Sequence, residues 1–241
     1  MTDAKRVLVI PAYNEAPHLA GVLEDILEAT DGFDVVVVDD GSSDRTGKIA
    51  SETGVRVLRH PYNLGYGAAL QTGYKYALRA GATLLVQMDA DGQHAAGDIR
   101  TLCEPIERGE LDLVIGSRFL EDPTYSMGAL RGAGRQFFRA AARAFGLRVS
   151  DPTSGFQAMN RRALRLYAGD FFPTDYPDVD SLLVAQRAGL RLGERPVSMT
   201  EGVRPSSLHA GLAPIYYVYK MLLSLWAAST SSGDALENGE E

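Results

Sequence analysis

Two aspartates, two residues apart, are the residues of this sequence best suited to chemistry. Asp89 and Asp91 follow a short apolar stretch that begins at Leu84, and Gly92 comes directly after them. The stretch has the length of a buried strand, and the glycine lets the chain turn away behind it. Side chains at i and i+2 of an extended chain share one face, so we expect both carboxylates at the carboxyl end of this strand, where open α/β sheets bind ligands. Two hard oxygen donors there predict a site for Mg²⁺ or Mn²⁺ that holds a diphosphate.

A plain turn is the simplest alternative for this stretch, since Asp and Gly supply side-chain capping and positive φ. An EF-hand loop is excluded, because Arg100 stands where the bidentate Glu belongs. Gly41–Lys48 resembles a phosphate-binding P-loop, but Ile49 occupies the position of the Ser or Thr that must reach Mg²⁺. The rest of the chain must therefore decide between a turn and a metal site.

The chain around these acids alternates between apolar runs of strand length and stretches with helical spacing of apolar residues. The runs predict strands at Val7–Pro11, Val35–Val38, Val55–Leu58, the stretch from Leu84, and Leu113–Ser117. The helical patterns are Leu19–Leu27, a segment capped by Ser43 or Asp44 that runs through Ile49, Gly67–Arg79 and Asp98–Arg108. Val35–Val38 is apolar on both faces, as a parallel sheet covered by helices requires. The alternation predicts an α/β fold with a parallel sheet and helices on both sides.

Composition and charge limit the class of protein. The 241 residues are 45% hydrophobic and 23% charged, which is typical of a globular chain with one sizeable domain. A net charge of −7 and a pI near 5.2 argue against a nucleic-acid-coating surface, so no nucleic-acid partner is expected. The one cysteine, Cys103, lies among apolar residues at helical spacing and is interpreted as a buried thiol. Met1–Arg6 leads into a strand without the apolar segment of a signal peptide, which indicates a cytoplasmic protein.

Six motifs occur in one order along the chain. They are Pro11–Glu15 (PAYNE), Val38–Thr46 (VDDGSSDRT), Asn63–Gly65 (NLG), Met88–His94 (MDADGQH), Gly116–Arg118 (GSR) and Asp151–Phe156 (DPTSGF). Together they resemble the family 2 glycosyltransferases with a GT-A fold, most closely the dolichyl- or polyprenyl-phosphate sugar transferases. The resemblance covers roughly residues 6 to 205, and the ordered set is far more specific than any single motif.

The resemblance implies a fold, a domain organisation and an activity. It implies an α/β domain at residues 1–205 with a Rossmann-like, mostly parallel sheet flanked by helices. Beyond that domain the chain departs from many relatives, and we expect a C-terminal helical appendage at 206–228 from the residues themselves. Members of that family transfer a sugar, with inversion, from a GDP- or UDP-sugar to a lipid phosphate. A nucleotide-sugar donor, a dolichyl or polyprenyl phosphate acceptor and a divalent cation, Mg²⁺ or Mn²⁺, are therefore expected.

The resemblance also implies roles for individual residues. The donor side would include Pro11, Tyr13, Glu15, Asp39, Asp40, Gly65 and Asp89. The metal ligands would be Asp89, Asp91 and Gln93, and the residues of the catalytic step would be Asp91, Arg118, Asp151 and Asp180. Contacts to the acceptor phosphate would come from Arg118, Arg131 and Arg204, since a guanidinium fork binds phosphate oxygens bidentately.

The identity of a general base is left open. A lipid phosphate is largely ionised near pH 7, because the second pKa of a phosphate monoester is about 6, so it needs positioning more than deprotonation. Asp151 would orient the acceptor or act as base, unless it only starts a turn before Pro152. Asp180 stands near where family 2 enzymes with hydroxyl acceptors carry their base, unless it only favours a helix dipole. A saccharide or other hydroxyl acceptor is therefore the alternative to a lipid phosphate.

The segment Leu212–Trp226 is apolar and aromatic. Lys220 interrupts it, and it falls short of the ~20 apolar residues that a spanning helix needs. Such a helix can lie at a membrane interface, pack on its own domain or pair with a second copy in a homo-oligomer. A lipid-phosphate acceptor requires some membrane contact, so we expect a cytoplasmic protein with peripheral contact at the inner face of the membrane. The Ser-, Gly- and Glu-rich residues 229–241 predict a disordered tail.

Two classes other than glycosyl transfer must be weighed. A nucleotidyltransferase also pairs acids on a metal, but such enzymes usually open with a Gly-rich loop bearing Arg or Lys, where this chain has Ala12–Glu15. A non-catalytic nucleotide-sugar-binding partner would keep the donor residues and lose the acceptor set. Arg118 and Asp151 are both present, which favours an enzyme.

Overall fold

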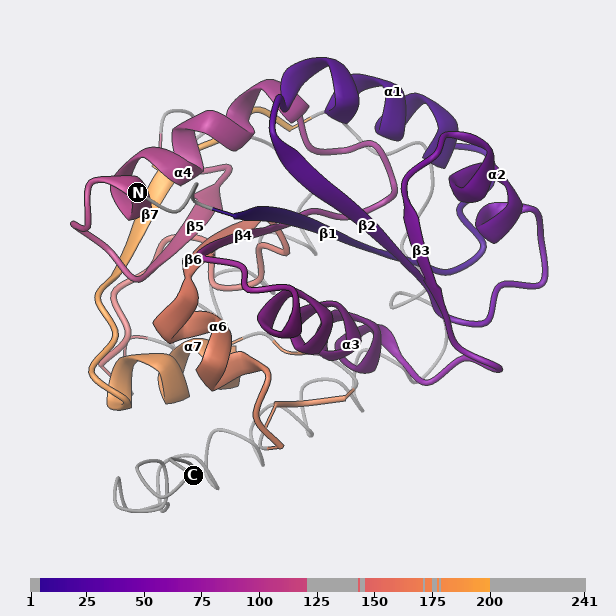
Figure 1. Ribbon diagram of the computed structural model, residues 1–241. Coiled ribbons are helices and arrows are strands. Elements are labelled where there is room, and N and C mark those ends of the chain that lie inside the picture. Colours follow the sequence, from indigo (N-terminus) through magenta and orange to yellow (C-terminus); the bar gives the residue numbers. More distant parts are fainter. Residues whose placement is uncertain are drawn as a thin grey trace, which may run out of the picture.

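The computed structural model describes residues 5–120, 143, 146–170, 172–174, 177 and 179–199. Within these residues, seven strands form one sheet in the order β3-β2-β1-β4-β6-β5-β7, with helices on both faces (Figure 1). All neighbouring strand pairs are parallel except the two that involve β6. The α/β architecture with a mostly parallel sheet is therefore confirmed.

The first half of the chain builds one side of the sheet from successive strand–helix units. Its elements are β1 (Arg6–Ala12), α1 (Leu19–Ala29), β2 (Phe33–Asp39), α2 (Thr46–Glu52), β3 (Arg56–Arg59), α3 (Tyr66–Arg79) and β4 (Leu84–Gln87). Their bounds agree with the predicted runs to within about three residues; the largest differences are that β2 begins two residues before Val35 and α2 ends three residues after Ile49. The four valines at 35–38 are buried, as a strand covered on both faces requires.

The second half of the chain is less regular. Its elements are η1 (Ala96–Asp98), α4 (Ile99–Glu107), β5 (Leu113–Ser117), β6 (Gln157–Asn160), α6 (Arg161–Tyr167), α7 (Val179–Arg187) and β7 (Leu192–Pro196). The apolar runs predict β5 and, one residue longer at each end, α4. They do not predict β6, α6, α7 or β7. Both missed strands are short and rich in polar residues, so they carry no apolar run that marks a strand.

Two hydrophobic clusters lie on opposite faces of the sheet. Successive residues of β1 divide between them: Val7 and Val9 pack into the cluster that includes α3, α6 and α7, and Leu8 and Ile10 into the cluster that includes α1 and α4. Figure 1 shows α1, α2 and α4 on one side of the strands and α3, α6 and α7 on the other. This layering buries β1 and β4 at the centre of the molecule and leaves the strand ends open for function.

The point where the strand order reverses lies at β1. From β1 the chain runs outward through β2 and β3, and it then returns to the other side of β1 as β4. In open α/β sheets the crevice outside the carboxyl ends of the strands at such a point is the usual ligand site. The loops that follow β1, β2 and β4, which carry three of the sequence motifs, meet there.

Several further expectations concern single features. Cys103 is buried, as predicted. The N-cap of α2 is Arg45, which makes no side-chain capping hydrogen bond, so the expectation that Ser43 or Asp44 caps this helix is wrong; Asp44, two residues before Thr46, still accepts the Thr46 N–H at 2.9 Å. Among the described residues, no helix combines the length and the apolar character needed to cross a bilayer. Residues 206–228 and 229–241, on which the helical appendage, the homo-oligomer contact and the disordered tail were predicted, lie outside the described residues.

Candidate functional site

The two acids after β4 sit in a turn and not in the strand. β4 ends at Gln87, Asp91 belongs to a turn, and Gly92 has a φ of 74°, a left-handed conformation that glycine adopts at little cost. The expectation that Asp89 and Asp91 share one face of an extended strand is therefore wrong. The strand ends at Gln87, earlier than the apolar pattern indicates, and both carboxylates follow the carboxyl end of a central strand.

Asp89 is held by two side chains, one from α3 and one from its own loop. The Tyr66 hydroxyl, at the start of α3, donates to Asp89 Oδ1 at 2.7 Å, and His94 Nε2 lies 3.4 Å from Asp89 Oδ2. Burial acts to raise the pKa of Asp89, but the hydrogen bonds from His94 and Tyr66 and the charges of His94 and Arg118 outweigh it, so the pKa is lowered. Asp89 is therefore an oriented carboxylate that is ionised at neutral pH, with 28% of its side chain exposed.

Asp91 has a different environment. Its Oδ1 accepts the Gln93 backbone N–H at 3.0 Å, and its Oδ2 accepts the Gln93 side-chain amide at 2.6 Å. Burial raises the pKa of Asp91, and the negative charge of Asp89 adds to the rise. The repulsion between these two acids is the kind of electrostatic strain that a bound cation relieves.

The donor set available for a metal consists of oxygen atoms. Within the described part of the chain there is no group of three or more His, Cys, Asp and Glu side chains that could enclose a metal by itself. Mg²⁺ commonly binds through one or two carboxylates together with water and substrate phosphates. Asp89 and Asp91, both partly exposed, fit that pattern, and Gln93 lies beside them through its contact with Asp91.

The loops after β1 and β2 form one hydrogen-bonded unit. The Asn14 N–H donates to Ser42 Oγ at 3.0 Å, and Asn14 Oδ1 accepts the Ser43 N–H at 2.9 Å. The Glu15 N–H donates to Thr46 Oγ1 at 2.8 Å. Two of the sequence motifs are therefore fastened to each other, with the exposed ring of Tyr13 beside the junction.

Asp39, at the end of β2, keeps one buried oxygen without a hydrogen bond. Its Oδ1 accepts the Ser42 N–H at 2.9 Å, and the side chain is fully buried. Arg59 Nε makes an ion pair with Oδ2 at 3.3 Å, but this oxygen has no hydrogen-bond partner. A buried acceptor of this kind is costly to leave unpaired, so a ligand N–H or O–H that reaches it gains a strong interaction. Pro11, also predicted for the donor side, is buried near the end of β1.

Asp40 is turned toward the loop that precedes α3. Its Oδ1 lies 2.6 Å from His60 Nδ1 and accepts the Leu64 N–H at 2.9 Å, while its Oδ2 accepts the Gly65 N–H at 2.9 Å. His60 Nε2 in turn lies 2.9 Å from Thr72 Oγ1. Asp40 is 2% exposed, so its carboxylate fixes the loop that leads into α3.

Arg118 and Asp151 are joined in a bidentate ion pair. Arg118 Nε donates to Asp151 Oδ2 and Nη2 donates to Oδ1, both at 2.6 Å, and Asp151 is 1% exposed. Arg118 follows β5, and Asp151 precedes β6, so the neighbouring strands bring the two predicted residues together. The positive charge of Arg118 contributes to the lowered pKa of Asp89, which links this pair to the acids after β4.

One further predicted residue, Asp180, lies in α7. Asp180 is in the first turn of α7, is 8% exposed, and its Oδ1 accepts the Ser181 N–H at 2.8 Å. Its charge adds to burial in raising the pKa of Tyr167. Arg131 and Arg204 lie outside the described residues.

Two residues that sequence analysis assigned no role also belong to the site. Tyr66 orients Asp89, and a Cβ on Gly155 would lie 2.7 Å from Asp89 Oδ2 and 2.8 Å from the Tyr66 hydroxyl. The Gln87 amide donates to the Gly155 carbonyl at 2.9 Å and so holds that backbone against the acids. Gly155 lies inside the DPTSGF motif, but only the packing of the chain shows why a side chain is excluded there.

Comparison with known proteins places the chain in a family. The model of "Glycosyl transferase family 2" matches residues 7–167. UDP-N-acetylglucosamine–dolichyl-phosphate N-acetylglucosaminyltransferase of Methanococcus voltae is 31% identical over 219 residues, with 82% of this chain and 86% of that protein covered. Undecaprenyl-phosphate mannosyltransferase of Micrococcus luteus is 34% identical over 210 residues, with 81% and 84% covered.

A solved structure supports the fold. Glucosyl-3-phosphoglycerate synthase from Mycobacterium tuberculosis, crystallised with Mn²⁺, UDP and glucosyl-3-phosphoglycerate, matches with a TM-score of 0.72 over 92% of this chain and 80% of that one. The sequence identity is 23%, so the likeness establishes the GT-A fold alone.

Proposed function

This chain belongs to glycosyl transferase family 2 and is a glycosyltransferase, and we propose that it transfers a sugar, with inversion, from a GDP- or UDP-sugar to a polyprenyl or dolichyl phosphate. The observation that carries the proposal is the Arg118–Asp151 pair, whose arginine charge acts on Asp89 after β4. This supports a role for Arg118 in binding the acceptor phosphate near the proposed place of the donor diphosphate. The names of both sequence relatives include a lipid phosphate, which supports the same acceptor class.

Asp89, Asp91 and Gln93 are the proposed holders of Mg²⁺ or Mn²⁺. When bound, the cation would neutralise the charge that develops on the nucleoside diphosphate as the sugar leaves. Tyr66 and His94 keep Asp89 oriented and ionised, so this carboxylate needs no rearrangement before it accepts a cation. The structure of glucosyl-3-phosphoglycerate synthase with Mn²⁺ and UDP supports a divalent cation in this fold.

The nucleoside is proposed to bind over the ends of β1 and β2. Asp39 Oδ2, which is buried without a hydrogen bond, suits an N–H of the base. Tyr13, 47% exposed, offers an aromatic face, and Pro11 and Glu15 complete the rim. Asp40 acts on the donor side through the Gly65 loop that it anchors, because both of its oxygens are already hydrogen-bonded.

The acceptor phosphate is proposed to meet Arg118, with Arg131 and Arg204 as further contacts. The phosphate arrives charged, since its second pKa is about 6, so it does not need a base near pH 7. Asp151 is fully engaged with Arg118, and we assign it the task of aiming the guanidinium. Asp180 would matter as a base only for a hydroxyl acceptor.

A comparison of two variants tests the acceptor. With a polyprenyl phosphate acceptor, Arg118→Lys should lower kcat by roughly 10²-fold through loss of the bidentate fork, and Asp180→Asn should change it little. With a hydroxyl acceptor, Asp180→Asn should lower turnover by roughly 10²-fold or more. Turnover is measured on undecaprenyl phosphate and on simple saccharides across GDP- and UDP-sugars, with Arg100→Lys, an exposed residue of α4, as the matched control. Appreciable saccharide transfer that collapses in Asp180→Asn would reject the lipid-phosphate acceptor.

The location of the enzyme follows from the acceptor. We propose a catalytic domain at residues 1–205 that works at the cytoplasmic face of a membrane, with residues 206–228 in peripheral contact with the lipid and 229–241 as a disordered tail. Sedimentation with anionic phospholipid vesicles should carry down the full chain but not a chain that ends at residue 205. If both remain in the supernatant, the membrane contact is wrong and a homo-oligomer through 206–228 becomes the alternative.

A further inference from the structure

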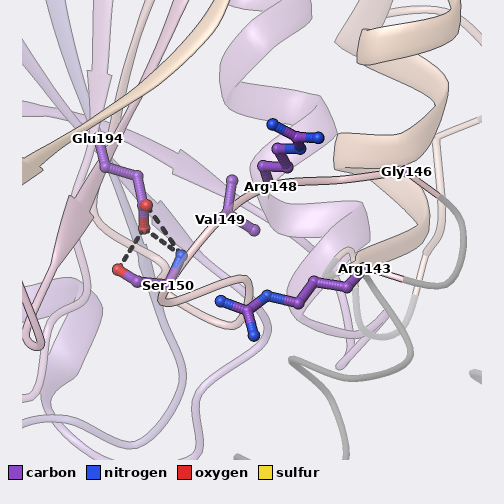
Figure 2. A pocket seen from close by; sticks show the side chains of 6 residues that line it. All are labelled: Arg143, Gly146, Arg148, Val149, Ser150 and Glu194. Atoms are coloured by element: carbon purple, nitrogen blue, oxygen red, sulfur yellow. Dashed lines mark hydrogen bonds between the residues drawn. The ribbon is translucent and has the colours of Figure 1, made fainter.

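A glutamate in the edge strand β7 is hydrogen-bonded to the loop that carries Asp151. Glu194 Oε1 accepts the Ser150 N–H at 2.8 Å, the Ser150 hydroxyl at 2.8 Å and the Asp151 N–H at 3.0 Å. Glu194 Oε2 lies 2.8 Å from the same Ser150 nitrogen. Figure 2 shows the Glu194 side chain turned from β7 toward Ser150. One carboxylate therefore holds two consecutive amides, which fixes the peptide that leads into Asp151.

The hydrogen bonds between the hydroxyl groups around Glu194 have a defined donor-to-acceptor direction. The Ser150 hydroxyl has one hydrogen, and it points to Glu194 Oε1, so in the contact at 2.6 Å with Ser117 Oγ it must act as the acceptor. Ser117 therefore donates to Ser150 and accepts the Phe119 N–H at 3.3 Å. The chain of donors runs from the residues after β5 to Glu194, which is its final acceptor. Chains of this kind are polarised and stiff.

The residue that follows Ser150 in this loop contacts Arg118. Asp151, whose N–H binds Glu194, uses both carboxylate oxygens for the Arg118 guanidinium. Ser117, which donates to Ser150 in the hydrogen-bond chain that ends at Glu194, directly precedes Arg118 in the sequence. Glu194 thus reaches Arg118 by two routes, through the Asp151 backbone and through the two serine hydroxyls.

Glu194 is not needed to neutralise a nearby arginine. Glu194 lines a pocket with Arg143, Gly146, Arg148, Val149 and Ser150. Among the described residues neither arginine forms an ion pair with it, and Figure 2 shows neither guanidinium at its carboxylate. The negative charge is balanced by amide and hydroxyl donors instead, which is the arrangement that aligns a loop.

We propose that Glu194 is a positioning residue of the acceptor side, which sets the place of Asp151 and, through it, the aim of Arg118. β7 does not depend on this side chain, since its register with β5 runs over five residue pairs, from Leu113↔Leu192 to Ser117↔Pro196. The proposal rests on the acceptor role proposed above for Arg118. Its chemistry is general: a small misplacement of a phosphate-binding fork lowers turnover without touching the donor.

The direct test is a spectroscopic one that needs no substrate. The Arg118 Nε–H, held by Asp151, should give a slowly exchanging ¹H–¹⁵N signal in the full chain, assigned by its loss in Arg118→Lys. In Glu194→Gln an amide N–H₂ faces the Ser150 N–H, so this signal should weaken or vanish. Arg195→Ala, the adjacent residue of β7, is the matched control and should keep it. An unchanged Arg118 signal in Glu194→Gln would overturn the proposal.

The kinetic test separates positioning from a loss of folding. With undecaprenyl phosphate as acceptor, Glu194→Gln should lower kcat by roughly 10-fold and Glu194→Ala by up to roughly 10²-fold, with donor affinity within about twofold of the wild type. In an Arg118→Lys background the same changes should have little further effect, because they act through Arg118. Full additivity, or a parallel loss of donor affinity and thermal stability, would indicate a merely structural role and overturn the proposal. A wild-type protein that transfers nothing to the lipid would reject the proposed acceptor, and the Arg118 signal would then decide on Glu194.

Discussion

The proposed donor side and the proposed acceptor side of this site are built in opposite ways. On the donor side, Asp39 has a buried oxygen without a hydrogen bond, and Asp91 is destabilised as an ion by its neighbour Asp89. On the acceptor side, the Arg118 and Asp151 charges are already matched at 2.6 Å. The donor side therefore presents unmet interactions to a ligand, whereas the acceptor side presents a finished pair.

This difference indicates how each side works. Unpaired acceptors and neighbouring anions favour a ligand that brings N–H groups and a cation, so the donor side gains most of its stabilisation on binding. A pre-formed ion pair gains less on binding, but it holds the guanidinium in one orientation and lowers the cost of ordering it. The proposed donor side is thus suited to binding its ligand tightly, and the proposed acceptor side to holding the Arg118 guanidinium in a fixed orientation.

The largest effect is expected from Asp91→Ala, which removes one of the two neighbouring carboxylates proposed to bind the cation. Transfer should fall by at least about 10³-fold, because the proposed cation would supply several kcal/mol of stabilisation to the leaving group in the transition state. Calorimetry should show that metal-dependent donor binding is lost, with the free energy of unfolding within about 0.5 kcal/mol of the wild type. Asp25→Ala, an exposed aspartate of α1, is the control. Unchanged donor affinity in the presence of metal would count against the site.

Gly155→Ala tests the place where the two sides touch. The new methyl would lie 2.7 Å from Asp89 Oδ2, so the acid or the loop must move, and we expect turnover to fall by roughly 10²-fold. Gly21→Ala in α1 is the control, since nothing lies within 4 Å of its Cβ, and it should stabilise the protein by about 0.5–1 kcal/mol. Wild-type turnover in Gly155→Ala would show that the acids tolerate displacement.

A moderate effect is expected from Asp39→Asn, which keeps the shape of the side chain and its contact with the Ser42 N–H. The substitution removes the negative charge of the side chain, or places an N–H₂ group where Oδ2 has no hydrogen bond, so nucleoside diphosphate binding should weaken by roughly 10-fold, or about 1.4 kcal/mol. The loss should be the same with and without metal. If only the metal-dependent part of the affinity changes, Asp39 does not bind the nucleoside.

The smallest effect on activity is expected at Asp112, which lies at the opposite end of β5 from Arg118. Hydrogen bonds from Arg191 dominate over burial and lower the pKa of Asp112 well below its ordinary value, with Asn160 as a further donor. Asp112→Asn should cost about 1–3 kcal/mol of stability at pH 7 and leave kcat unchanged. A change in kcat without a change in stability would contradict this separation of anchor and site.

The pH dependence of this anchor has a definite sign. The folded pKa is lowered, so the contribution of Asp112 is fully present above the unfolded pKa of about 3.9 and is lost as the pH falls toward the folded value. Chemical denaturation of the wild type should therefore show a steeper loss of stability between pH 5 and pH 3 than that of Asp112→Asn. Equal slopes would mean that the Arg191 contact does not persist in solution.

The half of the fold that the sequence predicts well is the half made of successive strand–helix units. Apolar runs and helical spacing locate β1 to β4 and their helices. The runs of β1, β2 and β4 are buried on both faces, so their apolar residues are visible in the sequence without knowledge of the neighbouring strands. The acids, Asp39 and the Pro11–Glu15 loop follow from this directly, since the ends of parallel strands meet at one edge of the sheet. Several of the motifs that resemble the family 2 glycosyltransferases lie in these loops, and their order along the chain can be read from the sequence alone.

Tertiary structure decided what those motifs touch. The strand ended at Gln87 and so left Asp89 and Asp91 outside it, and packing brought Gly155 and Tyr66 against Asp89. The sequence does not predict β6 and β7, because both are short and rich in polar residues. They form strands by pairing with β4 and β5, which the local sequence does not show. The contacts that depend on them join residues 33 and 44 positions apart, Arg118 with Asp151 and Ser150 with Glu194. No local pattern encodes such contacts, because they arise only when the sheet brings separate segments together.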